Sequence, residues 1–236
     1  VNRSEASDRV IIASTDHIVR WHIIAREGIE KLEDLKGKRI AYSGVGACSH
    51  YIAMLLAQKM GWDPVQDLAL LGGDYSIYPL KEGRVDAFIA YEVPFAMARA
   101  EGYRPIADLR EWNEPIPCSG VNASRTWAHE NRDTVIRFLK AVTEAISMMK
   151  KNKYLAYKAM AKWYKFTDVE IQQIIYDGAK EMPRKPYPTI PGIKKTMELY
   201  DSAQMRMYKP EDLYDDSFMK ELDESGFIDR LYSEQR

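Results

Sequence analysis

The chain has 236 residues, of which 46% are hydrophobic and 29% charged, and its formal net charge is −1. This composition is ordinary for a soluble globular protein, and the length is enough for one large domain or two smaller lobes. The near-zero charge provides no field for recruiting nucleic acid or an anionic membrane. No apolar stretch approaches the roughly 20 residues of a membrane-spanning helix. The polar start, VNRSEASD, does not have the pattern of a signal peptide.

The first third of the chain begins with two short apolar runs. Residues 9–15 predict one strand and residues 19–26 a second, with a turn at residues 15–17. One helical turn at residues 32–35 then leads to the stretch 37–102, around which the rest of the chain is organised.

Within that stretch, three apolar runs alternate with helical periods and glycine turns. Residues 39–43, 68–71 and 85–91 form the apolar runs. The alternation predicts a βαβαβ arrangement with a parallel sheet. Ligands of such sheets bind beyond the carboxyl ends of the strands, where helix N-termini present free N–H groups. The two strand ends at residues 43–49 and 91–94 are therefore the predicted location of function.

The second half of the chain predicts mostly helix. A strand at residues 118–124 ends at Ser124, which has the side chain of an N-cap. Residues 131–151 carry the clearest helical signal, because their apolar residues recur at spacings of three and four. Thr167 and Glu170 have the spacing of a capping box at the start of another helix. The remaining helices are expected at residues 154–164, 167–182, 192–207 and 217–224.

The glycine motif at the first strand end favours a polar cradle over a nucleotide site. Gly44 and Gly46 begin like a dinucleotide fingerprint, but Ser49 replaces its third glycine, so no nucleotide cofactor is expected. Small residues and a hydroxyl at a helix start suit an anion or a polar ligand. Glu92 at the other strand end has two open interpretations: it accepts hydrogen bonds from a cationic or amide group of a ligand, or it only favours its own helix N-terminus.

No catalytic or metal-binding motif is present in the sequence. The four histidines lack metal-ligand spacing, and there is no GxSxG nucleophile elbow. We therefore predict no catalytic residue, no metal and no cofactor.

The two cysteines, Cys48 and Cys118, are too far apart in sequence for a CxxC motif. The sequence does not say whether they pair. Because Cys48 lies at a helix start and Cys118 in a separate strand, we expect two small packed residues rather than a disulfide. A nucleophilic role for Cys48, with a pKa lowered by the helix N-terminus, stays open but is not favoured.

Three motifs, in their order and spacing, resemble the ABC-transporter substrate-binding family that takes nitrate, sulfonates, taurine and thiamine pyrimidine precursors. They are LEDLKGKRI at 32–40, SGVG at 43–46, and LKEGRVDA at 80–87 with Pro94. Residues 131–145 resemble the long helix of that family and residues 210–232 its usual ending, so the resemblance covers nearly the whole chain.

The resemblance implies a periplasmic-binding-protein type II fold, in which two α/β lobes joined by a hinge close on a ligand. Residues 1–36 and 112–236 would form lobe one, with a helix-rich C-terminal half, and residues 37–111 lobe two. Family members normally carry a further stretch upstream, so the first part of lobe one is expected to be missing. We expect a monomer unless another chain completes that lobe.

In that family, the SGVG loop and the segment before the proline contact the ligand. Carried over to this sequence, the expected ligand-binding residues are Ser43, Gly46, Ala47, Cys48, Ser49, Tyr91 and Glu92, with Thr15 and Asp16 added from the lobe-one side. Many relatives have more hydroxyl groups at the position of Ala47 and Cys48. With Tyr75, Tyr91 and Glu92 nearby, this departure favours an organic ligand that carries an aromatic ring or an amine.

The implied function is that of the solute-binding component of an ABC importer. It would capture a small organic solute, such as a sulfonate or a pyrimidine or thiamine precursor, in the cleft between its lobes and deliver it to a membrane permease. The expected location is periplasmic or tethered to the cell surface, with the signal segment outside this chain.

Two alternatives come from other classes. An enzyme on the same fold, such as a pyrimidine-precursor synthase or a menaquinone-pathway lyase, is one; the cysteine-rich iron motif of the synthases is not found here. The effector domain of a regulator is the other, and it would need a DNA-binding segment.

Overall fold

The computed structural model describes residues 8–233, so the polar start at residues 1–7 lies outside the described residues. Across residues 8–233, no helix combines the length and the apolar character needed to cross a membrane. The chain divides into two compact units, each of which is described by itself. Unit 1 comprises the residues up to Ile18, Pro115–Thr167 and the residues from Tyr176 onward; unit 2 comprises Val19–Glu114 and Asp168–Ile175.

Unit 2 is built on a five-stranded mixed sheet. In spatial order its strands are β4 (Ala69–Gly72), β3 (Arg39–Tyr42), β5 (Ala87–Ala90), β2 (His22–Ala25) and β6 (Pro105–Asp108). Strand β3 runs parallel to both β4 and β5, which confirms the predicted βαβαβ arrangement. Strand β2 is antiparallel to β5 and β6, so two antiparallel strands extend the parallel part.

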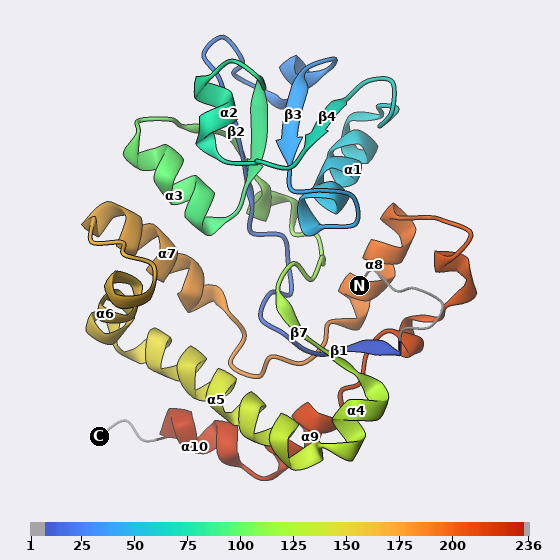
Figure 1. Cartoon of the computed structure of the whole chain (residues 1–236), viewed down its shortest axis with the longest axis vertical. Helices are drawn as coiled ribbons and strands as arrows, with labels where there is room; N and C mark the ends of the chain where they lie inside the picture. The colour runs from blue at the N-terminus through green and yellow to red at the C-terminus, as the bar shows by residue number, and fades with distance from the viewer. Residues whose placement is uncertain (1–7, 234–236) are drawn as a thin grey trace. The chain divides into compact units, whose positions relative to one another are not determined.

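Helices flank this sheet. Figure 1 shows α1 (Cys48–Met60) on one side of the strands, with α2 (Ile77–Lys81) and α3 (Glu92–Ala100) on the other. Two short 3-10 helices, Leu32–Leu35 and Leu109–Trp112, and the first residues of α7 (Val169–Glu181) also belong to the unit. All four residues of β5 are buried, as expected for a strand covered on both faces.

Unit 1 combines a two-stranded antiparallel ribbon with most of the helices. The ribbon pairs β1 (Arg9–Ser14) with β7 (Gly120–Ser124). The helices are α4 (Arg125–Glu130), α5 (Arg132–Lys151), α6 (Lys153–Trp163), the end of α7 (Val169–Glu181), α8 (Ile190–Leu199), α9 (Ser217–Glu224) and α10 (Phe227–Ser233), with 3-10 helices at Met205–Met207 and Pro210–Asp212. The predicted helix-rich second half is confirmed (Figure 1).

The core of unit 1 lies where the ribbon meets the long helix and the two C-terminal helices. Val10 and Ile12 of β1, Leu139 of α5, and Phe218 and Leu222 of α9 are almost completely buried in one cluster. Segments from both ends of the chain therefore share this core.

Some helices differ from the sequence expectations. The helix expected at residues 192–207 spans Ile190–Leu199 instead, and α10 is a separate helix that the sequence does not predict. The N-cap of α7 is Asp168 and not Thr167, because the Asp168 carboxylate accepts hydrogen bonds from the backbone N–H groups of Glu170 and Ile171.

The expected boundary between the lobes differs from the observed division at residues 19–36, 112–114 and 168–175, all of which belong to unit 2. Residues 19–36 are expected in lobe one, but β2 lies between β5 and β6 in the sheet of unit 2. The register pairs His22 with Ala90, and every residue of β2 is buried. The apolar run predicted a strand without showing which partner it would pair with.

A buried carboxylate ties three strands of this sheet together. Asp86, which is 5% exposed, precedes β5. Its carboxylate accepts hydrogen bonds from Arg26 Nε at 2.9 Å and from the backbone N, the Nε and the Nη2 of Arg39 at 2.9, 3.0 and 3.0 Å. These hydrogen bonds, foremost those from the Arg39 side chain, hold the pKa of Asp86 well below its usual range.

Candidate functional site

The ends of three strands of unit 2 meet at one edge of the sheet. The parallel register pairs Ala41 with Phe88, so the residues that follow β3 and those that follow β5 emerge side by side. Because β2 is antiparallel to β5, the residues that precede β2 reach the same edge. We call this edge the strand-end site. It comprises Arg20, Trp21, the turn at residues 43–50, Tyr91 and Glu92.

The turn from β3 into α1 is held by its own side chains. Ser49 is fully buried, and its hydroxyl accepts a hydrogen bond from the Ser43 N–H at 2.9 Å and lies 2.7 Å from the Ser43 hydroxyl. The Gly46 N–H donates to His50 Nδ1 at 3.2 Å. Gly46 has φ +75° and Gly44 φ +150°, backbone conformations that favour glycine. The Ser49 hydroxyl and the Gly46 amide therefore shape the turn from within.

The N-terminus of α1 is the electropositive part of this turn. Ala47 is the N-cap and supplies no side-chain cap to the helix. The first N–H groups of a helix lack intrahelical acceptors, and the helix dipole adds partial positive charge at this end. Burial lowers the pKa of His50, which favours the neutral ring whose Nδ1 accepts the bond from Gly46. Such an end suits a negatively charged group.

The expectation that the two cysteines are small packed residues and not disulfide-bonded is wrong. Cys48 and Cys118 are both disulfide-bonded, so the described residues contain no free thiol. Neither sequence separation nor the type of element that carries a cysteine fixes its position in space, which is why the sequence argument failed. A disulfide sulfur is not a thiolate, so the structure gives no support to Cys48 as a nucleophile.

A buried cation lies beside Tyr91 and Glu92. Arg20 is 5% exposed; its Nη1 lies 3.3 Å from Glu92 Oε1, and its Nη2 donates to the Tyr91 hydroxyl at 3.2 Å. The Trp21 ring stacks on the Tyr91 ring at a centroid distance of 5.0 Å. A buried guanidinium needs a counter-charge, and Glu92 supplies it.

The ion pair with Arg20 is a third role for Glu92, beside ligand binding and stabilisation of its own helix N-terminus, the two roles that the sequence left open. Glu92 is the first residue of α3, so it also favours that helix N-terminus. A ligand amine would have to share the carboxylate with Arg20.

Sequence reasoning missed Arg20 and Trp21. The available signal was a single charged residue inside the otherwise apolar run VRWHII, since an arginine in a buried strand must be paired. The partner itself, 72 positions away at Glu92, has no signature in a single sequence.

The two remaining expected ligand residues belong to unit 1. The Thr15 N–H donates to the Ser119 carbonyl at 2.9 Å, and Asp16 is 2% exposed. Their part in ligand binding, like that of the other expected residues, stays a prediction. Within residues 8–233, no group of three or more His, Cys, Asp or Glu side chains is placed to hold a metal ion.

His22, next to the site, makes the stability of unit 2 sensitive to acid. Its ring stacks on Phe95 at 3.6 Å, and among the described residues its Nδ1 has no hydrogen-bond partner. Burial lowers the pKa of His22 to about 4, against the opposing effect of the Asp108 carboxylate 3.8 Å from Nε2 and with a smaller contribution from Arg110.

We expect the free energy of unfolding to fall by about 2 kcal/mol between pH 7.5 and pH 5 on account of His22. The unfolded chain binds the proton near pH 6.5 and the folded one only near pH 4, so this stability is complete above pH 6.5 and is lost as the pH falls towards 4. Urea denaturation of the wild type and of His22→Gln at several pH values measures how steeply the free energy of unfolding of each protein changes with pH. Above pH 6.5 this pH dependence should be the same in the two proteins. An NMR titration of His22 with a midpoint near 6.5 would contradict the prediction.

The mixed α/β sheet, with a helix N-terminus at its strand ends, has the fold of periplasmic solute-binding proteins, as solved structures show. The nitrate-binding protein NrtA from Synechocystis PCC 6803 superposes with a TM-score of 0.71 at 12% identity, covering 94% of this chain and 69% of that one. The alkanesulfonate-binding protein SsuA from Xanthomonas axonopodis pv. citri, bound to MOPS, gives 0.68 at 16% identity over 91% and 73%. The desulfurization enzyme DSZB gives 0.62 at 15% identity over 94% and 80%.

The family model described as NMT1/THI5 like matches residues 10–154, more than half of the sequence, and the chain belongs to this family. No curated protein matches the sequence. The family and the fold suggested by the sequence motifs are thereby confirmed.

Proposed function

We propose that the chain is the solute-binding component of an ABC importer and that it captures a small organic solute carrying an anionic group, such as a sulfonate. One observation carries the proposal: the buried guanidinium of Arg20 lies at the same sheet edge as the N-terminus of α1. The α1 end presents partial positive charge and N–H donors, and Arg20 adds guanidinium N–H donors whose charge Glu92 balances; such donors recognise an oxyanion.

The names of similar structures support an anionic ligand. NrtA is named for nitrate and SsuA for alkanesulfonates, and both ligands are oxyanions. The aromatic pair Trp21 and Tyr91 suits an apolar or aromatic part of the same solute. An amine group, which the sequence also favoured, fits less well because Glu92 is already paired with Arg20.

The proposed partner and location follow from this role. A solute-binding component delivers its ligand to a membrane permease, and binding shifts the protein towards the form that the permease recognises. We propose the periplasm or the outer cell surface as its location. The disulfide-bonded state of both cysteines is consistent with an oxidising compartment.

A ligand screen by thermal denaturation tests the proposal. The panel contains taurine, alkanesulfonates, nitrate, sulfate, pyrimidines and aromatic carboxylates. A sulfonate should raise the melting temperature, with an increase that grows with its concentration as linkage requires. If only a neutral pyrimidine stabilised the protein, the proposed role in an importer would stand, but the proposal of an anionic ligand would be wrong. A folded chain that responds to no compound would overturn the proposal.

Arg20→Lys tests the residue that carries the argument. Lysine keeps the charge beside Glu92 but loses the planar fork of the guanidinium, so we expect the affinity for the stabilising sulfonate to fall about tenfold. Arg84→Lys, at an exposed arginine of the same unit, is the matched control and should stay within about twofold. Isothermal titration calorimetry measures both. Equal affinities in the two variants would exclude Arg20 from the ligand site.

An enzyme on the same fold is the second candidate, because DSZB superposes over 94% of this chain. Incubating the stabilising ligand with the protein and analysing the mixture by mass spectrometry separates the two functions. A binding protein returns the ligand unchanged, whereas an enzyme releases a product.

A further inference from the structure

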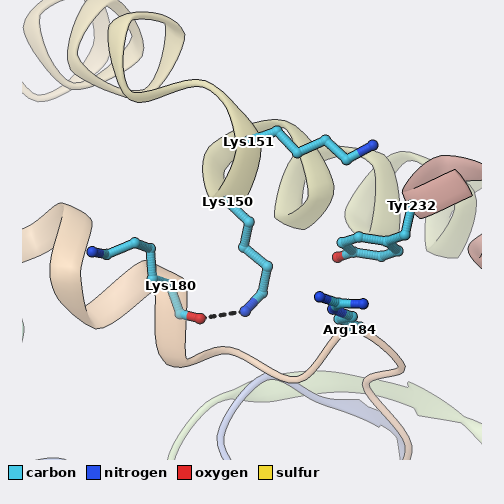
Figure 2. Close-up of a pocket in the computed structure, with 5 residues that line it drawn as sticks. All are labelled: Lys150, Lys151, Lys180, Arg184 and Tyr232. Carbon is cyan, nitrogen blue, oxygen red and sulfur yellow. Dashed lines mark hydrogen bonds between the residues drawn. The ribbon is translucent and has the colours of Figure 1, made fainter. Parts of the chain in front are cut away.

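Unit 1 contains a basic pocket that shares no residue with the strand-end site. Its volume is about 450 Å³, and its lining residues are Lys150, Lys151, Lys180, Arg184 and Tyr232. Figure 2 shows that they come from the end of α5, the end of α7, the segment after α7, and α10. Four cationic residues and one phenol line this pocket, and no carboxylate does. We call it the basic pocket.

Two of the lysines are fixed in place by backbone carbonyl groups. The Lys150 ammonium donates to the carbonyl of Lys180 in the last turn of α7, as Figure 2 shows. The Lys151 ammonium donates to the carbonyl of Leu231 in α10. An ammonium has three donors, and each of these bonds uses one. These two hydrogen bonds orient the ammonium groups, and a backbone carbonyl brings no formal negative charge to either of them.

Arg184 and Tyr232 form the other side of the pocket. The Arg184 guanidinium carbon lies 4.7 Å from the centroid of the Tyr232 ring, and the Lys151 Nζ lies 5.5 Å from it. In Figure 2 the two cations approach the ring from opposite sides. The side chain of Lys180 points away, and its ammonium pairs with Asp177 at 2.9 Å. The positive charge of the pocket thus comes from Lys150, Lys151 and Arg184.

The Tyr232 hydroxyl supplies an independent sign of a ligand. Its oxygen is buried and has no hydrogen-bond partner among the described residues. The neighbouring Ser147 hydroxyl donates its proton to the Leu231 carbonyl at 3.3 Å, so the proton of the Tyr232 hydroxyl still lacks an acceptor among the described residues. Figure 2 shows the phenol oxygen directed into the space between Lys150 and Arg184. A buried polar group without a partner is costly, and an acceptor at this point would satisfy it.

The protonation state of Tyr232 agrees with a donor role. Burial raises the pKa of the phenol, while the positive charge of Arg184 and the nearby Ser147 hydroxyl oppose that shift. The phenol accordingly keeps its proton at neutral pH and can donate it in a hydrogen bond.

We propose that the basic pocket binds a phosphate group, either as inorganic phosphate or as part of a small phosphate monoester. Lys150, Arg184 and the Tyr232 O–H face one space, and Lys151 adds positive charge from the other side of the ring; this arrangement suits a doubly charged tetrahedral oxyanion. The volume of about 450 Å³ exceeds that of a bare phosphate and leaves room for the organic part of a monoester. This proposal is independent of the ligand bound at the strand-end site.

Isothermal titration calorimetry with inorganic phosphate tests the proposal. Sodium chloride keeps the ionic strength constant during the titration. Saturable binding is expected, and Arg184→Gln should weaken it about tenfold through the loss of a charged donor. Tyr232→Phe keeps the ring and should weaken it about threefold through the loss of the hydroxyl. Lys158→Gln on α6 is the matched control, because it removes one exposed positive charge from the same unit and should leave binding unchanged.

The same titrations separate the possible outcomes. Tighter binding of β-glycerophosphate than of phosphate would support the proposal and identify a monoester as the ligand; equal binding would support it and identify the inorganic ion. The proposal is overturned if no saturable binding occurs. It is also overturned if Arg20→Lys abolishes phosphate binding while Arg184→Gln and Tyr232→Phe leave it intact, since the ion then occupies the strand-end site. Circular dichroism melts show whether each variant is folded.

Discussion

Replacing Phe218 with alanine is expected to lower the free energy of unfolding of unit 1 by about 4 kcal/mol. Phe218 is fully buried in the core where β1, α5 and α9 meet. Its ring lies 4.7 Å from the guanidinium carbon of Arg132 and 5.2 Å from the ring of His129. Alanine leaves a cavity there, and the neighbours cannot fill it without moving paired backbone.

Urea denaturation, combined with hydrogen exchange of the α5 and β7 amides, measures this loss. Faster hydrogen exchange of these amides would show that the loss of stability lies in unit 1. Phe138→Ala is the matched control, because Phe138 is on α5 but is 53% exposed, and it should stay within about 0.5 kcal/mol of the wild type. A loss below about 1 kcal/mol in Phe218→Ala would contradict the packing of α9 on the ribbon.

Asp86→Asn is expected to cost about 3 kcal/mol in unit 2. Asparagine removes the negative charge that accepts hydrogen bonds from the side chains of Arg26 and Arg39 and from the Arg39 amide. Both arginines are about half exposed, so water partly solvates them in the variant and limits the loss.

The pH dependence of the difference in unfolding free energy between the wild type and Asp86→Asn tests whether the Asp86 carboxylate is its source. Because the folded-state pKa of Asp86 is depressed, the carboxylate contributes its full stability above about pH 4 and loses it as the pH falls further. The gap between wild type and Asp86→Asn should therefore close in acid. Glu27→Gln removes an exposed charge next to Arg26 and should show little effect at any pH. A gap that stays constant down to pH 2 would exclude the carboxylate as its source.

The sequence predicted the local elements well, because they depend on neighbouring residues. The apolar spacing in residues 131–151 matches α5, and the alternation in residues 37–102 matches the strands and helices of unit 2. Ser124 accepts the Trp127 N–H as an N-cap should. The capping box at Thr167 was wrong because the adjacent Asp168 competes for the same N–H groups and is the residue that binds them.

The strand-end site was predictable in place and not in detail. Glycines before a helix start located the turn at residues 43–49, and the motif resemblance added Tyr91 and Glu92. The inward orientation of the Ser49 hydroxyl, the pairing of Arg20 with Glu92 and the bonded state of both cysteines were not predictable. Each depends on side chains that only the folded chain brings together.

The discontinuity of unit 1 has a consequence for the order of folding. Most of unit 2 is the continuous stretch Val19–Glu114, so its sheet can form while the ribosome is still making the rest of the chain. Strand β1 must instead wait for β7, and Ile11 hydrogen-bonds the backbone of Leu213, about two hundred residues later. Strand β1 is thus without its partner until β7 has been made, and during that time it is open to aggregation and to capture by chaperones.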